Sequence, residues 1–252
     1  MIRKLHWIPN LFTLGNLSLG FFAIILALYP LERQPNAIML AGGLILLAAL
    51  LDGLDGTAAR LLNASSELGA QLDSLADLTT FGIAPGVIMY SLVLHKWNIS
   101  LENFPNIPFG MFITVIWPAT AAYRLARFNV VHAENSFTGL PSPTAGIIMA
   151  LFPVIQNETP GIPDVLLALI YVLTSFLMVS TVKFSKPQIT FIRKFSPVRF
   201  GIVVVFLMAG LLFLYFRFGA GYAALALLIL ISVYVAAGIV SFVIHAIQVL
   251  RM

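Results

Sequence analysis

Four aspartates lie inside stretches of apolar residues that are otherwise suited to cross a membrane. Of the ten acidic residues in the chain, these four are Asp52, Asp55, Asp73 and Asp77. Each carboxylate inside a membrane helix costs about 2.5–3.5 kcal/mol on insertion scales, and helix packing, which relies on small residues, does not require it. We therefore interpret the four as a functional site. The alternative is a structural ion network in which Arg60, Arg124 and Arg127 neutralise them.

The spacing of the four aspartates predicts that their carboxylates converge. Asp52 and Asp55 are three residues apart and Asp73 and Asp77 are four apart, so each pair shares one face of a helix. The short connection at residues 63–67 predicts an antiparallel helix hairpin. At about 1.5 Å per residue, all four carboxylates then lie roughly 10–16 Å from the turn. We expect one cluster just inside the membrane interface.

A cluster built only from carboxylate oxygens is typical of sites for hard divalent cations. The chain has no Cys, and its four His residues show no spacing that would make a metal-binding pair. These features favour Mg²⁺ or Mn²⁺ over zinc, and four negative charges nearly balance two such ions. Cations held in this way neutralise the charge that develops in phosphoryl transfer, so a diphosphate substrate is expected.

The elements that must position these residues are membrane helices. The 252 residues are 60% hydrophobic and 10% charged, with a mean hydropathy of +0.99, which excludes an ordinary soluble protein. No stretch is polar enough to fold separately in water, so residues 1–252 are expected to form a single all-α polytopic membrane domain. About eight transmembrane helices are predicted, near residues 10–30, 37–62, 68–94, 108–129, 141–157, 163–182, 199–217 and 222–248.

The distribution of Lys and Arg predicts the orientation of these helices. With eight spans, eleven of the fourteen basic residues fall on the side of the two termini: Arg3, Lys4, Arg60, Arg124, Arg127, Lys183, Lys186, Arg193, Lys194, Arg199 and Arg251. Only Arg33, Lys96 and Arg217 fall on the other side. Both termini are therefore expected in the cytoplasm, and the aspartate cluster just inside the cytoplasmic interface of the membrane. The same bias explains the net charge of +4 without nucleic acid as a partner, although the basic stretch 183–199 could also bind anionic membrane lipids.

Residues 52–77 carry a longer motif around the four aspartates. They read DGLDGTAARLLNASSELGAQLDSLAD, which contains every fixed position of the pattern DxxDGxxAR(x8)GxxxDxxxD. By this motif the chain resembles the CDP-alcohol phosphatidyltransferases. Further segments are similar to the phosphatidylserine synthase branch of that superfamily: Pro9 to Asn16, Asp77 to Pro85, Arg124 to Asn129, and Gly139 to Pro143.

The resemblance implies an enzyme that transfers the phosphatidyl group of CDP-diacylglycerol to L-serine, giving phosphatidylserine and CMP. It implies that Asp52, Asp55, Asp73 and Asp77 hold Mg²⁺ or Mn²⁺ and that Asp77 is also the catalytic base. It further implies that the CDP-diacylglycerol site includes Asn10, Thr13, Gly56, Ala59 and Arg60. The serine carboxylate and the lipid phosphate require cations of their own, for which the candidates are Arg124 and Arg127, with Asn129 lining the acceptor pocket.

Several alternatives remain open at the level of sequence. Within the superfamily the acceptor could be glycerol 3-phosphate or inositol phosphate, and Arg60, Arg124 and Arg127 could be plain interfacial anchors. A cation or proton transporter would also place acids in the membrane, although usually at the midplane and with inverted repeats. A noncatalytic scaffold would leave the buried acids unexplained. Relatives imply a homodimer, and the lack of a targeting segment suits a prokaryotic cell membrane.

Overall fold

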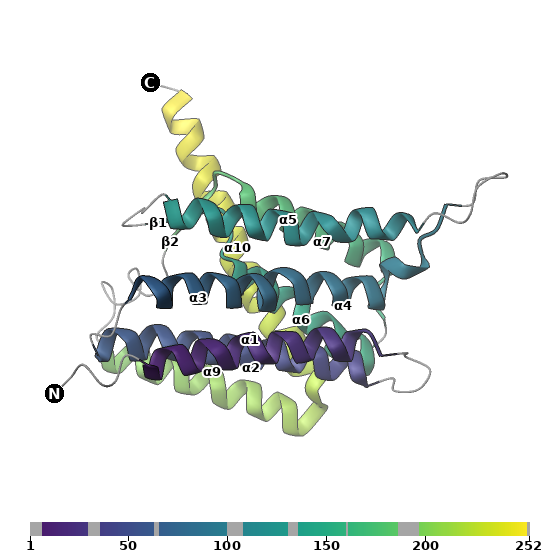
Figure 1. The fold of residues 1–252 in the computed structure, drawn as a ribbon, viewed down its shortest axis with the longest axis horizontal. Coiled ribbons are helices and arrows are strands. Elements are labelled where there is room, and N and C mark those ends of the chain that lie inside the picture. The colour runs from purple at the N-terminus through teal and green to yellow at the C-terminus, as the bar shows by residue number, and fades with distance from the viewer. Residues whose placement is uncertain are drawn as a thin grey trace.

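The computed structural model describes residues 7–29, 36–62, 66–99, 108–130, 136–159, 161–185 and 197–250. This part of the chain is almost entirely helical (Figure 1). Its α-helices are α1 (Trp7–Ala27), α2 (Ala37–Leu61), α3 (Glu67–Asp77), α4 (Ala84–Leu92), α5 (Phe109–Val130), α6 (Ser142–Glu158), α7 (Asp164–Val179), α9 (Pro197–Phe218) and α10 (Ala220–Leu250). Shorter elements are the π-helical turn η2 (Leu78–Ile83), the 3-10 turn η3 (Leu94–Lys96), and the antiparallel strands β1 (Ser136–Thr138) and β2 (Lys183–Ser185).

The lengths and apolar composition of these helices are those of an integral membrane protein. Within the described ranges, five segments are long and apolar enough to cross a bilayer: Trp7–Ala27, Ala37–Thr57, Glu67–Leu92, Phe109–Val130 and Ala220–Ile244. Two shorter helical segments, Asp164–Val179 and Val205–Phe218, are also apolar. A helix of about 16 residues extends only about 24 Å, less than the roughly 30 Å hydrocarbon core. Helices occur at all eight predicted ranges, but the number that crosses the membrane stays a prediction.

The helices lie mostly along one direction. In Figure 1, α3, η2 and α4 form a continuous rod, with α5 on one side of it and α1 and α2 on the other, while α10 crosses the bundle obliquely. The first residues of α1 and α3 and the last residues of α2 and α5 lie at the same end, beside β1 and β2 (Figure 1). Because Asp52 and Asp55 lie in the last three turns of α2, and Asp73 and Asp77 lie on α3, we call it the aspartate end.

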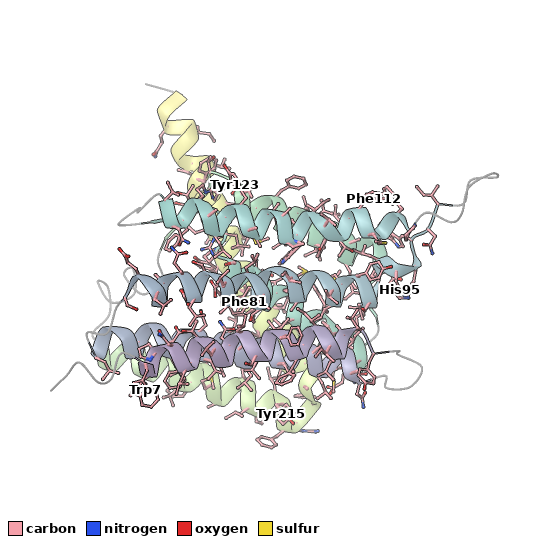
Figure 2. The ribbon with its side chains drawn as sticks, in the orientation of Figure 1. Trp7, Phe81, His95, Phe112, Tyr123 and Tyr215 are labelled. Atoms are coloured by element: carbon pink, nitrogen blue, oxygen red, sulfur yellow. The ribbon has the colours of Figure 1, made fainter. Side chains whose placement is uncertain are left out.

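The backbone hydrogen-bonding pattern of the rod changes near a proline. Pro85 has no backbone N–H to donate to the carbonyl of Phe81, four residues earlier, and the backbone widens into the π-helical turn η2 just before it. The indole Nε1 of Trp117, on α5, donates to that carbonyl at 3.0 Å. Trp117 in turn stacks on Tyr171 of α7 with ring centroids 5.1 Å apart. Phe81 itself is fully buried in the middle of the rod (Figure 2), so the turn ties α4 to the core.

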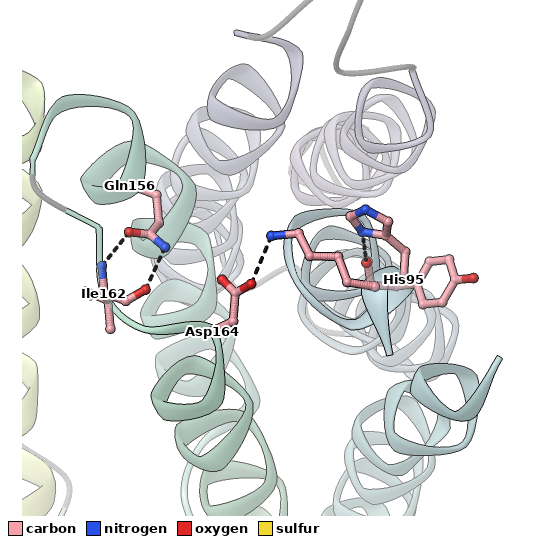
Figure 3. Close-up of polar contacts among 6 residues, drawn as sticks. His95, Gln156, Ile162 and Asp164 are labelled. Carbon is pink, nitrogen blue, oxygen red and sulfur yellow. Dashed lines mark hydrogen bonds and ion pairs between the residues drawn. The ribbon is translucent and has the colours of Figure 1, made fainter. Parts of the chain in front are cut away.

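Polar contacts hold the opposite end of the bundle together (Figure 3). Lys96, after α4, pairs with Asp164 at the start of α7, with Nζ and Oδ2 2.9 Å apart. The amide of Gln156 both donates to the carbonyl of Ile162 at 2.9 Å and accepts from its N–H at 2.7 Å. These contacts join α4, α6 and α7 away from the aspartates. Asp164, at this end of the bundle, is thus neutralised by a lysine.

Candidate active site

The carboxylates of α2 and α3 converge as their spacing predicts. One oxygen from each of Asp52, Asp55 and Asp73 lies within 4.8 Å of the other two, so all three can reach one cation. Ser66 begins the second helix of this pair: its hydroxyl accepts a hydrogen bond from the N–H of Gly69 at 3.0 Å and caps the start of α3. Asp55 is only 6% exposed, whereas Asp52 and Asp73 are half-buried.

Asp77 is the fourth acidic residue of the cluster and lies one turn beyond Asp73 on α3. Its side chain is 8% exposed and comes within hydrogen-bonding reach of the Asp52 carboxyl across the two helices. Its Oδ1 is buried and has no hydrogen-bond partner. Asp77 is the last residue of α3, directly before the π-helical turn, a kind of irregularity that is frequent at functional sites.

Helix α1 covers the cluster on one side. The Thr13 hydroxyl lies 3.0 Å from Oδ2 of Asp55 and 3.1 Å from the carbonyl of Pro9, and can donate to either. Asn10, one turn earlier, is half-buried and places its Oδ1 beside Gly69 at the start of α3. Of the residues that the resemblance assigned to CDP-diacylglycerol, Thr13 therefore contacts Asp55, and Asn10 lies beside Gly69, one turn of α3 before Asp73.

Arg124 is the cation closest to the cluster among the described side chains. It is 7% exposed and interacts electrostatically with both Asp77 and Asp52. Its Nη1 donates to the hydroxyl of Ser142, a fully buried residue in the first turn of α6. The sequence did not predict this contact, although Ser142 belongs to the segment Gly139 to Pro143 that the resemblance singled out. Arg124 is thus held in place beside the acids by a neutral partner.

Arg127 has a different environment, although it lies only one turn along α5. Its guanidinium donates to the carbonyl of Val179 at 3.0 Å and of Thr138 at 2.7 Å, with longer contacts to those of Met178 and Ser180 at 3.4 Å. Most of these acceptors are the free carbonyls at the end of α7, which a cation stabilises. Arg127 therefore joins α5 to α7 and β1.

Gly139 makes this junction possible. Its φ of +81° favours glycine, and a Cβ there would lie 2.1 Å from the carbonyl oxygen of Met178 and 2.9 Å from Nη2 of Arg127. Its N–H donates to the carbonyl of Val182 at 2.8 Å. The segment around Gly139 is thereby fixed against α7, and it leads directly into the α6 turn that carries Ser142.

Of the remaining predicted residues, the structure describes the surroundings of some and not of others. Asn129 is hydrogen-bonded to Ser74 of α3: its Nδ2 donates to the Ser74 Oγ at 3.0 Å. Ser74 directly follows Asp73 in the sequence. Gly56 is half-buried on α2 beside Asp55. Ala59 and Arg60 belong to α2, but their side chains lie outside the part that the structure describes.

The donor set fits a hard divalent cation. It consists of carboxylate oxygens from α2 and α3, and one of these oxygens, Oδ1 of Asp77, is buried and unpaired. The Thr13 hydroxyl of α1 and the Arg124 guanidinium lie nearby. Arg124 is the nearby cation among the described side chains, and its single positive charge cannot balance four carboxylates. Such a site can hold a metal ion and present it, with Arg124, to an anionic substrate.

Comparison with known proteins gives a family match over the same region. A family model described as CDP-alcohol phosphatidyltransferase matches residues 6–185, which include all four aspartates and both arginines of α5. Helices α9 and α10 lie beyond the matched region.

Similar curated proteins come from bacteria and yeast. A Helicobacter pylori protein is 34% identical over 189 residues, covering 73% of each chain. A Bacillus subtilis protein is 35% identical over 182 residues, covering 71% of this chain and 90% of its own. A Saccharomyces cerevisiae protein is 36% identical over 155 residues, covering 57% of this chain and 52% of its own. Each of the three is named CDP-diacylglycerol–serine O-phosphatidyltransferase.

Proposed function

Because the chain belongs to the CDP-alcohol phosphatidyltransferase family, we propose that it transfers the phosphatidyl group of CDP-diacylglycerol to L-serine, giving phosphatidylserine and CMP. The observation that carries this proposal is the convergence of four carboxylates within the matched region, on the helix hairpin that bears the family motif. The choice of serine is supported by the names of the similar bacterial and yeast proteins.

The cofactor is proposed to be Mg²⁺ or Mn²⁺, with two ions in the site. Asp52, Asp55 and Asp73 offer oxygens that can share one ion, and Asp77 lies against Asp52 to extend the site. When bound, the cations neutralise the diphosphate oxygens and the charge on the departing CMP.

The cytidine diphosphate head is proposed to lie against α1 and α2. On α1, Thr13 contacts Asp55 and Asn10 lies beside Gly69, and on α2 Gly56 offers backbone without a side chain. Ala59 and Arg60 complete this assignment from the family motif, with Arg60 near the phosphates. The acyl chains then remain in the bilayer.

The proposed reaction is one displacement at the β-phosphorus. The serine hydroxyl oxygen forms a new bond to phosphorus, the bond from phosphorus to the CMP oxygen breaks, and CMP leaves with those electrons. The hydroxyl proton moves to the Asp77 carboxylate. Asp77 suits this role because it is the most deeply placed acid of α3 and one of its oxygens is unpaired.

Arg124 is proposed to bind the serine carboxylate. That carboxylate would be repelled by the four acids, and Arg124 is the buried cation that lies beside them. Arg127 already donates to backbone carbonyls of α7 and β1, so we propose that its role is structural: it joins α5 to these elements near the acceptor site. Asn129, fixed on Ser74, is proposed to line the acceptor pocket.

The protein is proposed to form one membrane domain with eight spans and both termini in the cytoplasm. The aspartate end then faces the cytoplasm, where CDP-diacylglycerol heads and serine are accessible to it. A prokaryotic cell membrane and a homodimer stay predictions from the sequence and the family, and chemical crosslinking in native membranes tests the dimer.

A panel of acceptors tests the proposed function. Purified protein in nanodiscs is given CDP-diacylglycerol, Mn²⁺ and one acceptor at a time: L-serine, glycerol 3-phosphate or inositol phosphate. We expect phosphatidylserine, identified by mass spectrometry, together with CMP. A lipid product formed from glycerol 3-phosphate and not from serine would show that serine is the wrong acceptor, while the family assignment would stand.

A further inference from the structure

The buried surroundings of the aspartate cluster contain a second polar group that the proposed reaction does not use. Across the part of the chain that the structure describes, three buried side-chain atoms lack a hydrogen-bond partner: Nδ2 and Oδ1 of Asn16, and Oδ1 of Asp77. Asn16 is fully buried in the middle of α1. Burying an amide without hydrogen-bond partners is unfavourable, so an unpaired buried amide requires an explanation.

The helix packing places Asn16 one turn further along α1 than Thr13, the residue that contacts Asp55. Thr13, Asn16 and Gly20 lie along the buried stripe of α1, and Thr13 reaches Asp55. On the rod, Thr80 donates its hydroxyl to the backbone carbonyl of Asn16 at 3.0 Å. This contact aligns Asn16 with Thr80.

Two facts then direct the Asn16 side chain toward Asp77. Helices α1 and α3 run in the same direction (Figure 1), and Asp77 precedes Thr80 by three residues just as Thr13 precedes Asn16. Side chains on a helix tilt toward its N-terminus, so the Asn16 amide points from the level of Thr80 toward that of Asp77.

The close approach of α1 to the rod fixes this geometry. A Cβ on Gly20 would lie 2.2 Å from Oγ1 of Thr80 and 2.8 Å from its Cα, so only glycine permits this crossing. The amide of Asn16 is therefore held at a set depth, and the unpaired Oδ1 of Asp77 is a buried acceptor on the neighbouring rod.

We propose that Asn16 is a positioning residue that forms the floor of the metal site. With a cation in the site, Nδ2 of Asn16 would donate to the unpaired Oδ1 of Asp77 and so orient that carboxylate toward the ion. This inference rests on the proposed metal-dependent function. Groups that orient metal ligands in this way typically change metal affinity by 10- to 100-fold when removed.

The test measures Mn²⁺ affinity and stability, without turnover. Wild type and Asn16→Leu are placed in phosphatidylcholine nanodiscs; the Mn²⁺ Kd is obtained by electron paramagnetic resonance, and the Tm by thermal unfolding without metal. We expect Asn16→Leu to raise the Kd about 10-fold or more. We also expect the Tm of the metal-free protein to rise by about 2–4 °C, because the unpaired amide is removed.

A structural role for Asn16 predicts the opposite change in stability. A lower Tm of metal-free Asn16→Leu, or a Kd within twofold of wild type, would overturn the inference. Asn16→Ala is made in parallel, since the smaller side chain avoids any clash and must show the same weakened Mn²⁺ binding. Asn157→Leu, the same change at the C-terminal end of α6, is the control and should leave the Kd unchanged.

The outcome also separates this inference from the function it rests on. If wild type does not bind Mn²⁺ at all, the proposed metal site fails, and Asn16 loses its assigned role with it. If wild type binds Mn²⁺ and both Asn16 variants bind equally well, only the role of Asn16 fails.

Discussion

At the scale of single residues, two arginines one turn apart on α5 have different partners. Arg124 is buried beside Asp77 and Asp52 and is held by Ser142, whereas Arg127 donates to carbonyls of α7 and β1. Their spacing alone made them equivalent candidates for the serine carboxylate. The contacts distinguish them, because a guanidinium that already caps a helix has few donors left for a substrate.

Replacing each arginine by alanine should therefore have different effects. Arg124→Ala should raise the KM for serine by roughly 30- to 800-fold, which is about 2–4 kcal/mol, the usual cost of removing one partner of a buried charge pair. Arg127→Ala should instead lower the Tm. Steady-state kinetics with varied serine, and unfolding scans of both proteins, check this; a serine KM raised only by Arg127→Ala would reverse the assignment.

Asp77 is expected to act on the acceptor proton in addition to binding metal. Asp77→Asn keeps the shape of the side chain but removes its ability to take a proton, so turnover should fall about 10²- to 10⁴-fold. The binding of CDP-diacylglycerol, measured separately by equilibrium titration, should weaken much less. Comparable losses in binding and turnover would indicate that Asp77 is only a metal ligand.

At the scale of elements, the acceptor side depends on the junction among α5, α7 and the strand β1. Gly139 makes this junction close enough for Arg127 to cap α7, and it leads into the α6 turn that holds Arg124 through Ser142. Disturbing one residue here should therefore loosen several elements.

Gly139→Ala tests the junction. The positive φ and the clash with the Met178 carbonyl should cost about 2 kcal/mol or more, which lowers the Tm by at least about 4 °C. Gly210→Ala is the matched control, because a Cβ at Gly210 on α9 meets nothing within 4 Å. An equal Tm for both variants would show that the close approach at Gly139 does not hold the elements together.

The hairpin could be predicted from the sequence, and the junction could not. Asp52, Asp55, Asp73 and Asp77 converge because helical period and a short connection fix their relative positions locally. The partners of Arg127 are backbone carbonyls of α7, about 50 residues away, and any sequence offers such groups. Asn16 had a detectable signal, since it is an amide within an apolar stretch on the same stripe as Thr13, but its depth depends on how α1 crosses the rod.

At the scale of the whole molecule, the orientation in the membrane is a prediction from the Lys and Arg distribution. The paired strands β1 and β2 set Ser136 opposite Ser185, so both must lie on the same side of the membrane. Asn98 follows η3 at the opposite end of the rod.

Single cysteines test this orientation, because the chain has none of its own. Cysteines at Ser136 and at Ser185 should react only with reagents that enter the cytoplasm, and one at Asn98 only with external reagents. Labelling of intact and permeabilised cells with a membrane-impermeant maleimide measures this. Cytoplasmic labelling at position 98 would contradict the predicted number of spans.

The central claim is that the carboxylates of α2 and α3 form a metal site that supports phosphatidyl transfer to serine. Its most direct test is CMP release from CDP-diacylglycerol and serine at saturating Mn²⁺, compared among Asp52→Asn, Asp55→Asn, Asp73→Asn and the control Asp164→Asn. An amide is a much weaker ligand for a hard cation, so each of the first three should lose about 100-fold or more of the activity. Asp164→Asn, which removes only the pair with Lys96 at the other end of the bundle, should remain active. Near-normal turnover in the three cluster variants, or metal-independent turnover in wild type, would contradict the account.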